Sequence, residues 1–154
     1  MSFPDQQSEM LQVCRRIFSE NLADLILGYT AGELEGRMIP AFVRPGQDPD
    51  RLVWNPACTI NLAKYLLKRS ERVAIIAKPC DTRAIIMFLI EKQLKREQLY
   101  VVGMECPGMR DQDGKMASGC DTCAVKIPPL YDVLIKTNES GAQNYRSIEK
   151  AAAQ

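Results

Sequence analysis

The 154-residue sequence contains no histidine. Sites that use an imidazole as a general base or as a metal ligand are therefore excluded. They include serine and cysteine hydrolases with a histidine base, histidine-ligated haem, Rieske clusters and histidine-containing zinc sites. Any metal centre built from soft ligands must be held by the six cysteines.

Other features missing from the chain narrow its class further. No apolar run approaches the roughly 20 residues that span a bilayer, and the first residues lack the basic and apolar regions of a signal peptide. We therefore expect no membrane span and a cytoplasmic protein whose cysteines stay reduced. The formal net charge of +1 indicates no nucleic-acid partner. No G-x-G-x-x-G fingerprint of a dinucleotide site is present.

The length suits one domain with its own apolar core. We expect this domain over residues 1–136, followed by a polar tail over residues 137–154. A strand is predicted over residues 38–44, with Pro40 favouring an edge position, and a last strand within residues 127–135. The overall prediction is an α/β fold in which helices flank a small, largely parallel sheet.

The most informative stretch is a strand, a corner and a helix. Residues 73–77 form an apolar run typical of a buried strand, the corner is Lys78-Pro79-Cys80, and a helix with Asp81 as its N-cap follows. The free N–H groups at a helix N-terminus favour negative charge, and therefore favour a thiolate over a thiol at Cys80. A second strand, over residues 99–103, leads to Cys106. Both cysteines follow the ends of strands that we expect to be parallel, so they should lie at the carboxyl edge of the sheet. Ligands bind at this edge in open parallel sheets.

Two further helices are predicted, each with one cysteine. Apolar residues at helical spacing indicate a helix over residues 6–27, ended by Gly28, with Cys14 as a core residue. A helix over residues 56–69 would hold Cys58 in its first turn. Cys58 can be read as a packing residue, as a neighbour of the site or as a ligand.

Cys120 and Cys123 form a C-x-x-C pair, a motif shared by thiol oxidoreductases, zinc sites and iron–sulfur sites. Thioredoxin-like chemistry places the pair at a helix start directly after a strand, whereas here it follows a polar loop. Structural zinc usually takes two close cysteine pairs. A [4Fe–4S] cluster tolerates dispersed ligands and is favoured, although a zinc site, a redox dithiol and packing cysteines stay open.

Basic residues flank these four cysteines along the chain. Cations near an iron–sulfur cluster stabilise its reduced, more negative form. We expect Lys78 and Arg83 to lie beside the cofactor, with Arg83 in the first turn of the helix behind Cys80. The other flanking cations are Arg110, Lys115 and Lys126.

The chain resembles a known family at these residues. The features that carry the resemblance are Pro79-Cys80 before a helix, Gly103-Met-Glu-Cys106 at a strand end, Cys120-x-x-Cys123, and Tyr131-Asp-Val-Leu-Ile135. Over roughly residues 25–136 it is similar to the N-terminal region of the beta subunits of coenzyme F-420-reducing hydrogenases and dehydrogenases. Related iron–sulfur subunits occur with formate dehydrogenases and heterodisulfide-reductase-like complexes. The resemblance implies that Cys80, Cys106, Cys120 and Cys123 hold one [4Fe–4S] cluster.

The chain also departs from that family. Full-length members are longer, bind a flavin and the deazaflavin coenzyme, and in some cases carry a ferredoxin module with C-x-x-C-x-x-C motifs. The segment expected to complete the flavin and deazaflavin sites is largely absent here.

We therefore expect a non-catalytic electron-transfer subunit of an anaerobic oxidoreductase complex. It would dock on a larger redox subunit and meet a redox coenzyme only together with that partner. One alternative is a flavin-dependent beta subunit with FAD or FMN that passes electrons to a deazaflavin or nicotinamide. The other is a zinc-stabilised assembly subunit without a redox role.

Overall fold

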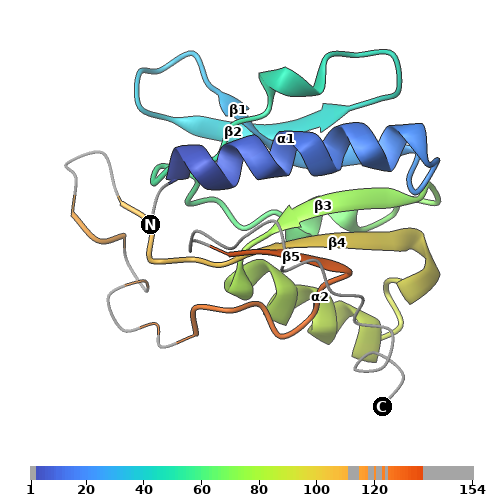
Figure 1. Cartoon of the computed structure of the whole chain (residues 1–154). Helices are drawn as coiled ribbons and strands as arrows, with labels where there is room; N and C mark the ends of the chain where they lie inside the picture. The colour runs from blue at the N-terminus through green and yellow to red at the C-terminus, as the bar shows by residue number, and fades with distance from the viewer. Residues whose placement is uncertain (1–2, 111–114, 118–119, 121–122, 124, 137–154) are drawn as a thin grey trace.

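The computed structural model describes residues 3–110, 115–117, 120, 123 and 125–136. Five strands form one sheet in the order β2-β1-β3-β4-β5 (Figure 1). Only β2 runs antiparallel to its neighbour, and the other pairings are parallel. This confirms the expected α/β fold with a largely parallel sheet, and β2 lies at the edge, as Pro40 suggested. The strands are β1 (Leu25–Ala31), β2 (Met38–Val43), β3 (Val73–Ala77), β4 (Leu99–Met104) and β5 (Val133–Ile135).

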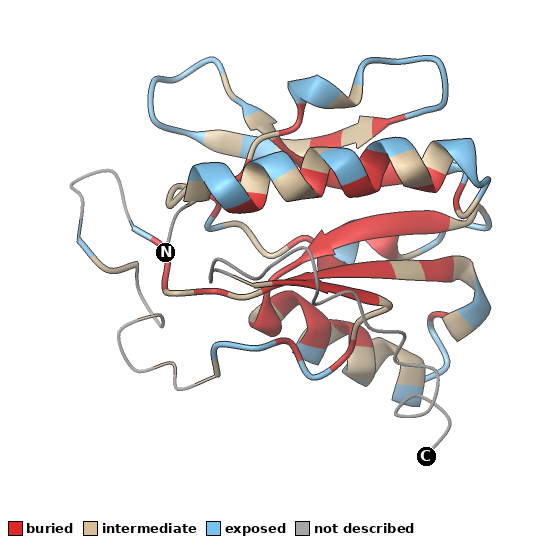
Figure 2. Ribbon diagram, in the orientation of Figure 1, coloured by how far each residue is buried: buried red, intermediate tan, exposed pale blue. Residues whose placement is uncertain are grey.

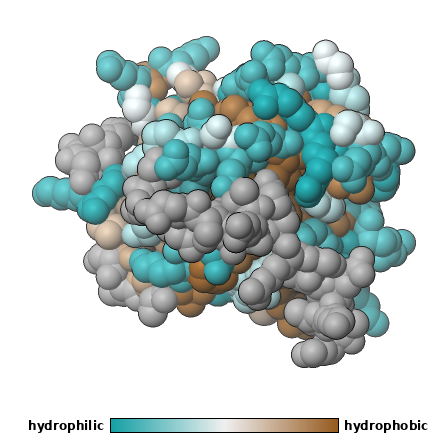
Figure 3. Space-filling model, in the orientation of Figure 1, coloured by the Kyte–Doolittle hydropathy of each residue, from teal (hydrophilic) through white to brown (hydrophobic). Residues whose placement is uncertain are grey.

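Within the described residues, two α-helices and three short 3₁₀ turns accompany the sheet (Figure 1). The outer side of α1 (Phe3–Ser19) is largely hydrophilic (Figure 3), and α2 (Pro79–Ile90) crosses from β3 to β4. A crossover of this kind is what parallel strands require. The turns are η1 (Pro49–Arg51), η2 (Ala63–Leu66) and η3 (Arg96–Gln98). No helix in the described part of the chain is long and apolar enough to cross a membrane. The proposed tail from residue 137 lies outside the described residues.

The core is centred on β1 and β3, which are buried over most of their length (Figure 2). Strands covered on both faces read as continuous apolar runs. The indole of Trp54, one of the largest fully buried side chains, donates a hydrogen bond to Gln6 Oε1 (2.9 Å). The Gln6 amide in turn donates to the Glu105 carbonyl oxygen (2.9 Å), so that α1 is tied to the segment that follows β4.

The helix predicted over residues 6–27 is wrong in its second half. The helix α1 ends at Ser19, where Asn21 adopts a left-handed conformation (φ 56°). The Leu22 N–H donates to the Ile17 carbonyl and the Asn21 N–H to the Phe18 carbonyl, which is a Schellman cap. The apolar residues beyond the cap continue the helical spacing by coincidence and form β1.

Gly28 therefore has a packing role inside β1 and does not end a helix. A Cβ atom at this position would lie only 3.2 Å from Ile76 Cγ1 and from Leu52 Cδ2. A glycine lets these neighbours pack directly against the strand backbone.

The helix predicted over residues 56–69 is also wrong, because only the short turn η2 forms there. Hydrogen bonds that this segment donates to the start of α2 hold it instead. The Leu62 N–H donates to Asp81 Oδ1 (2.8 Å), and the Asn61 amide donates to the Cys80 carbonyl (3.2 Å). Asn61 Oδ1 also accepts from a backbone N–H two residues later, a local turn that competes with a helix.

The burial of β1 can be tested at two neighbouring positions. Ile26 and Leu27 point to opposite faces of the sheet, and both are 0% exposed. Each alanine variant should therefore lower the free energy of unfolding by about 2–5 kcal/mol. Urea denaturation measures this change, with Ile39→Ala on β2 as a matched control, since Ile39 is 43% exposed. A large loss at only one of the two β1 positions would contradict burial on both faces.

Candidate metal centre

All four cysteines predicted as ligands line one cavity of about 230 Å³. They reach it from three segments of the chain: the start of α2, the segment after β4, and the C-x-x-C pair. The strands β3 and β4 are parallel neighbours and both end beside this cavity, so it lies at the carboxyl edge of the sheet. The other lining residues are Thr59, Lys78, Pro79, Arg83, Gly108, Met109, Val125 and Lys126.

The first turn of α2 fixes Cys80. Lys78 is the N-cap residue and Pro79 is the first helical residue, a position where the missing N–H of proline costs nothing. Asp81 is the third helical residue and accepts a hydrogen bond from the Lys78 backbone N–H (2.8 Å). The prediction of Asp81 as N-cap is thus wrong by three positions, because the helix begins earlier than its apolar spacing indicates.

Cys106 lies two residues beyond the end of β4, in a segment held by the returning chain. Its backbone N–H donates to the Lys126 carbonyl (2.8 Å), and the Glu105 N–H donates to the Ile135 carbonyl (2.9 Å). The close approach of the returning chain needs a glycine in β4. A Cβ atom on Gly103 would lie 2.9 Å from Tyr131 Cβ.

Between Cys106 and the C-x-x-C pair, Arg110 and Met116 form an isolated antiparallel bridge. The Cys123 backbone N–H donates to the Cys120 carbonyl (3.1 Å), and Cys123 Sγ lies 3.4 Å from the Val125 carbonyl oxygen. Both cysteines are half-buried.

Burial opposes ionisation of the Cys80 thiol. Loss of solvent raises its pKa, the Asp81 carboxylate raises it further, and the Lys78 ammonium lowers it. The Asp81 backbone N–H at the helix start lowers the pKa of Cys80, in the direction expected of a helix N-terminus, but the net shift is upward. Burial and a neighbouring carboxylate outweigh the helix end.

Cys106 has a similar but more cationic environment. Burial raises the pKa of its thiol, while the Gly108 backbone N–H and the Lys78 ammonium lower it. The neighbouring Cys120 thiol raises it, and Cys106 in turn raises the pKa of Cys80. These couplings indicate that the thiols of Cys80, Cys106 and Cys120 lie close enough to interact.

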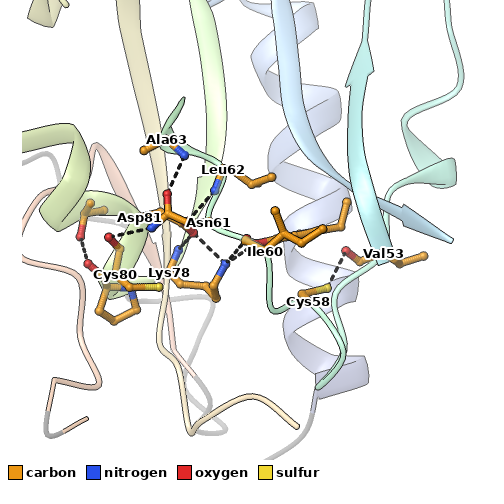
Figure 4. A network of polar contacts seen from close by, with 12 residues as sticks. Val53, Cys58, Ile60, Asn61, Leu62, Ala63, Lys78, Cys80 and Asp81 are labelled. Carbon is orange, nitrogen blue, oxygen red and sulfur yellow. Dashed lines mark hydrogen bonds and ion pairs between the residues drawn. The ribbon is translucent and has the colours of Figure 1, made fainter. Parts of the chain in front are cut away.

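A buried network lies behind the cavity (Figure 4). Lys78 is only 2% exposed, and its ammonium donates to Asp81 Oδ2 (3.0 Å), to the Ile60 carbonyl (3.1 Å) and to the Tyr29 hydroxyl. The sequence predicted that Lys78 lies beside the site, but it did not predict the partners of its ammonium. The spacing of Lys78 and Asp81, three residues apart at a helix start, is a usable signal for an ion pair. No local signal links Tyr29 to them.

Three cations line the cavity, and its described lining includes no carboxylate. They are Lys78, the exposed Arg83, and Lys126. Arg110 and Lys115, which flank the cysteines in sequence, are not among the lining residues. The cavity thus offers thiols and positive charge, a combination suited to an anionic thiolate-ligated group.

The remaining two cysteines are buried and are not among the residues that line the cavity, although Cys58 is next to the lining residue Thr59 and close enough to Lys78 and Asp81 for both charges to act on its pKa. Cys14 lies on the buried stripe of α1, where burial raises the pKa of its thiol to about 12. Burial likewise raises the pKa of Cys58 to about 11, and its sulfur lies 3.8 Å from Asn55 Oδ1. Both positions agree with a packing role.

Among the described residues, no three or more cysteine, histidine or acidic side chains are grouped so that they could hold one metal ion. What the four cysteines share in the structure is the cavity that they line.

The fold and site thus define an α/β domain with a cysteine-lined cavity at the sheet edge. No protein-family model matches the chain. The beta subunit of F420-dependent formate dehydrogenase 1 from Methanococcus maripaludis is 24% identical to it over 95 residues. The match covers 60% of this chain but 24% of that subunit, so the chain matches about a quarter of the relative's length. This weak similarity supports, at most, that the chain is related to the family of that subunit.

The thiol environments predict a pattern of alkylation in the native, metal-free chain. At pH 8 the pKa of about 11 leaves about one in a thousand Cys58 side chains as the reactive thiolate. Iodoacetamide should therefore label the half-buried Cys120 and Cys123 well before Cys14 and Cys58. Labelling of Cys58 should rise about tenfold per pH unit as the pH approaches that pKa. Mass spectrometry of peptides measures both effects, and equal rates at Cys58 and Cys120 would refute them.

Proposed function

We propose that this chain is an electron-transfer subunit that carries one [4Fe–4S] cluster. Cys80, Cys106, Cys120 and Cys123 would hold the cluster, one thiolate on each iron. The observation that carries the proposal is a single cavity lined by these four cysteines and three cations, with no carboxylate in its described lining. The donor set fits the group, because cysteine thiolate is the usual protein ligand of such clusters.

The spatial arrangement favours a cluster over zinc. A structural zinc ion draws four sulfurs to about 2.3 Å from one centre. A cubane cluster instead spreads its four thiolates over four irons around a larger core. Four thiols that reach one cavity from three segments of the chain suit the larger core of a cluster. The zinc-stabilised assembly subunit is therefore the weaker interpretation.

The charges around the cavity also suit a cluster. A cluster with four thiolate ligands is anionic and becomes more negative on reduction. Lys78 and Arg83 would lie beside it, as would Lys126, and would stabilise the reduced state. The Gly108 N–H, which lowers the pKa of Cys106, would contribute in the same direction.

The similarity to a formate dehydrogenase beta subunit supports a redox role inside an oxidoreductase complex. The F420-dependent activity belongs to that relative, and this chain matches about a quarter of it. A single cluster passes one electron at a time, whereas hydride transfer needs a two-electron cofactor. We therefore propose a relay that docks on a larger redox subunit of an anaerobic complex of the hydrogenase, formate dehydrogenase or heterodisulfide-reductase-like kind.

The alternative is a flavin-dependent beta subunit that reduces a deazaflavin or nicotinamide. Pockets for cofactor-sized ligands usually measure about 300–1,000 Å³. The cavity of about 230 Å³ is smaller and already has four cysteines in its wall. Its size favours a compact inorganic group over FAD or FMN.

The ligand assignment predicts which cysteines the cluster needs. Serine in place of Cys80, Cys106, Cys120 or Cys123 should remove or destabilise the cluster, because each change deletes one thiolate ligand. Iron and sulfide analysis of protein purified without oxygen measures this loss, together with EPR of the reduced state. The matched controls are Cys14→Ser and Cys58→Ser, which should keep full iron content. Full iron in the Cys80 or Cys106 variant, or loss of iron in the Cys58 control, would overturn the ligand set.

The relay proposal predicts a limited reactivity for the isolated chain. It should accept an electron from dithionite, yet reduce neither nicotinamide nor deazaflavin at a useful rate, because it holds no two-electron cofactor. Absorbance during an anaerobic titration measures the electron uptake from dithionite. Turnover assays with nicotinamide and with deazaflavin measure the expected lack of coenzyme reduction. Stoichiometric flavin in the purified protein, combined with coenzyme turnover, would replace the relay with the flavoenzyme.

A further inference from the structure

The corner after β3 contains a fully buried ion pair. Lys78 Nζ lies 3.0 Å from Asp81 Oδ2, and the two side chains are 2% and 0% exposed. Removing two charges from water costs several kcal/mol per ion unless close geometry and further hydrogen bonds offset the loss. An ion pair at this depth therefore requires supporting contacts.

Those contacts come from two other parts of the chain and from the corner itself. The Lys78 ammonium also donates to the Ile60 carbonyl (3.1 Å) and to the hydroxyl of Tyr29 on β1. Asp81 Oδ1 accepts the Leu62 N–H (2.8 Å), and its Oδ2 accepts the Lys78 backbone N–H (2.8 Å). Both charged groups are thus held in one orientation (Figure 4).

The orientation of the pair relative to the cavity is asymmetric. Lys78 is among the residues that line the cavity, whereas Asp81 is not among its described lining residues. Within the pair, the cationic residue therefore belongs to the cavity wall, and the anionic residue is not part of its described lining. Charges that are buried in this way are poorly screened and act over several ångströms.

We propose that this pair is an electrostatic device that sets the reduction potential of the cluster. Lys78 stabilises the charge that the cluster gains on reduction, and Asp81 offsets part of that effect. Tyr29 is a positioning residue, because its hydroxyl and the Ile60 carbonyl keep the ammonium at the cavity wall. The inference rests on the proposed function, since it concerns the same cysteine site.

The test is a double-mutant cycle read out as the midpoint potential of the cluster. Lys78→Met, Asp81→Asn and the double variant are titrated with dithionite, which supplies the one electron that the cluster gains. Lys78→Met should lower the potential and Asp81→Asn should raise it. The double variant should lie between the two single variants, because both charges are gone. A pair that only stabilises the fold would give no such opposite shifts.

Lys92→Met provides a charge-matched control. Lys92 is exposed beyond the far end of α2, and 12 helical residues place that end about 18 Å from the corner. This distance exceeds the screening length in physiological salt, so the potential of this variant should not change.

The cycle stays informative if one single variant fails to fold. Comparing the double variant with the remaining single variant still isolates one charge, and the double variant leaves no buried charge unpaired. Potentials that shift in the same direction, or do not shift, in iron-replete protein would overturn this inference alone. A wild-type chain that takes up no iron and sulfide would instead overturn the proposed function, and the inference with it.

Discussion

The parallel pairing of β3 with β4 is the constraint on which the site depends. Ala77 pairs with Gly103, so the two strands end at the same edge of the sheet. Whatever follows either strand must leave the sheet at that edge. Cys80 and Cys106 both follow within three residues of a strand end, and a shared cavity is the consequence. The C-x-x-C pair reaches the same cavity because the chain between β4 and β5 returns to pair with β4.

A set of hydrogen bonds holds the chain segments together at this edge. The start of α2 provides Asp81, which binds both the backbone of its own corner and the backbone at Leu62. The segment before η2 is thereby fixed against the helix, and the Ile60 carbonyl is presented to the Lys78 ammonium. The site and the core are consequently one structure, since Tyr29 of the central strand β1 contacts the same ammonium.

The sequence predicts the parts of this arrangement that depend on local pattern. The apolar run of β3, the corner at Lys78 and Pro79, and the strand before Cys106 are each marked by residues within a few positions. Parallel pairing then predicts that Cys80 and Cys106 meet. This much of the fold and of the candidate site follows from patterning and from the general geometry of parallel sheets.

The errors occur where contacts between distant segments decide the structure. Helical spacing continues from α1 into β1, and only the left-handed turn at Asn21 separates the two elements. Residues 56–69 have helical spacing too, but hydrogen bonds to Asp81 and to the Cys80 carbonyl hold the chain in another conformation. The partnership of Lys78 with Tyr29 spans 49 residues, so no local pattern marks it.

Burial has two opposite effects at this site, and both bear on the proposed role. It raises the pKa of Cys80 and Cys106, so that the metal-free cavity favours neutral thiols. A metal centre held by these thiols would have to displace their protons on binding, and its loading would therefore depend on pH. The same burial removes water that would screen the ammonium of Lys78, and so strengthens its effect on any charge in the cavity. The cavity thus disfavours isolated thiolates while Lys78, a poorly screened cation, belongs to its wall, and this is the electrostatic setting that the proposed cluster would meet.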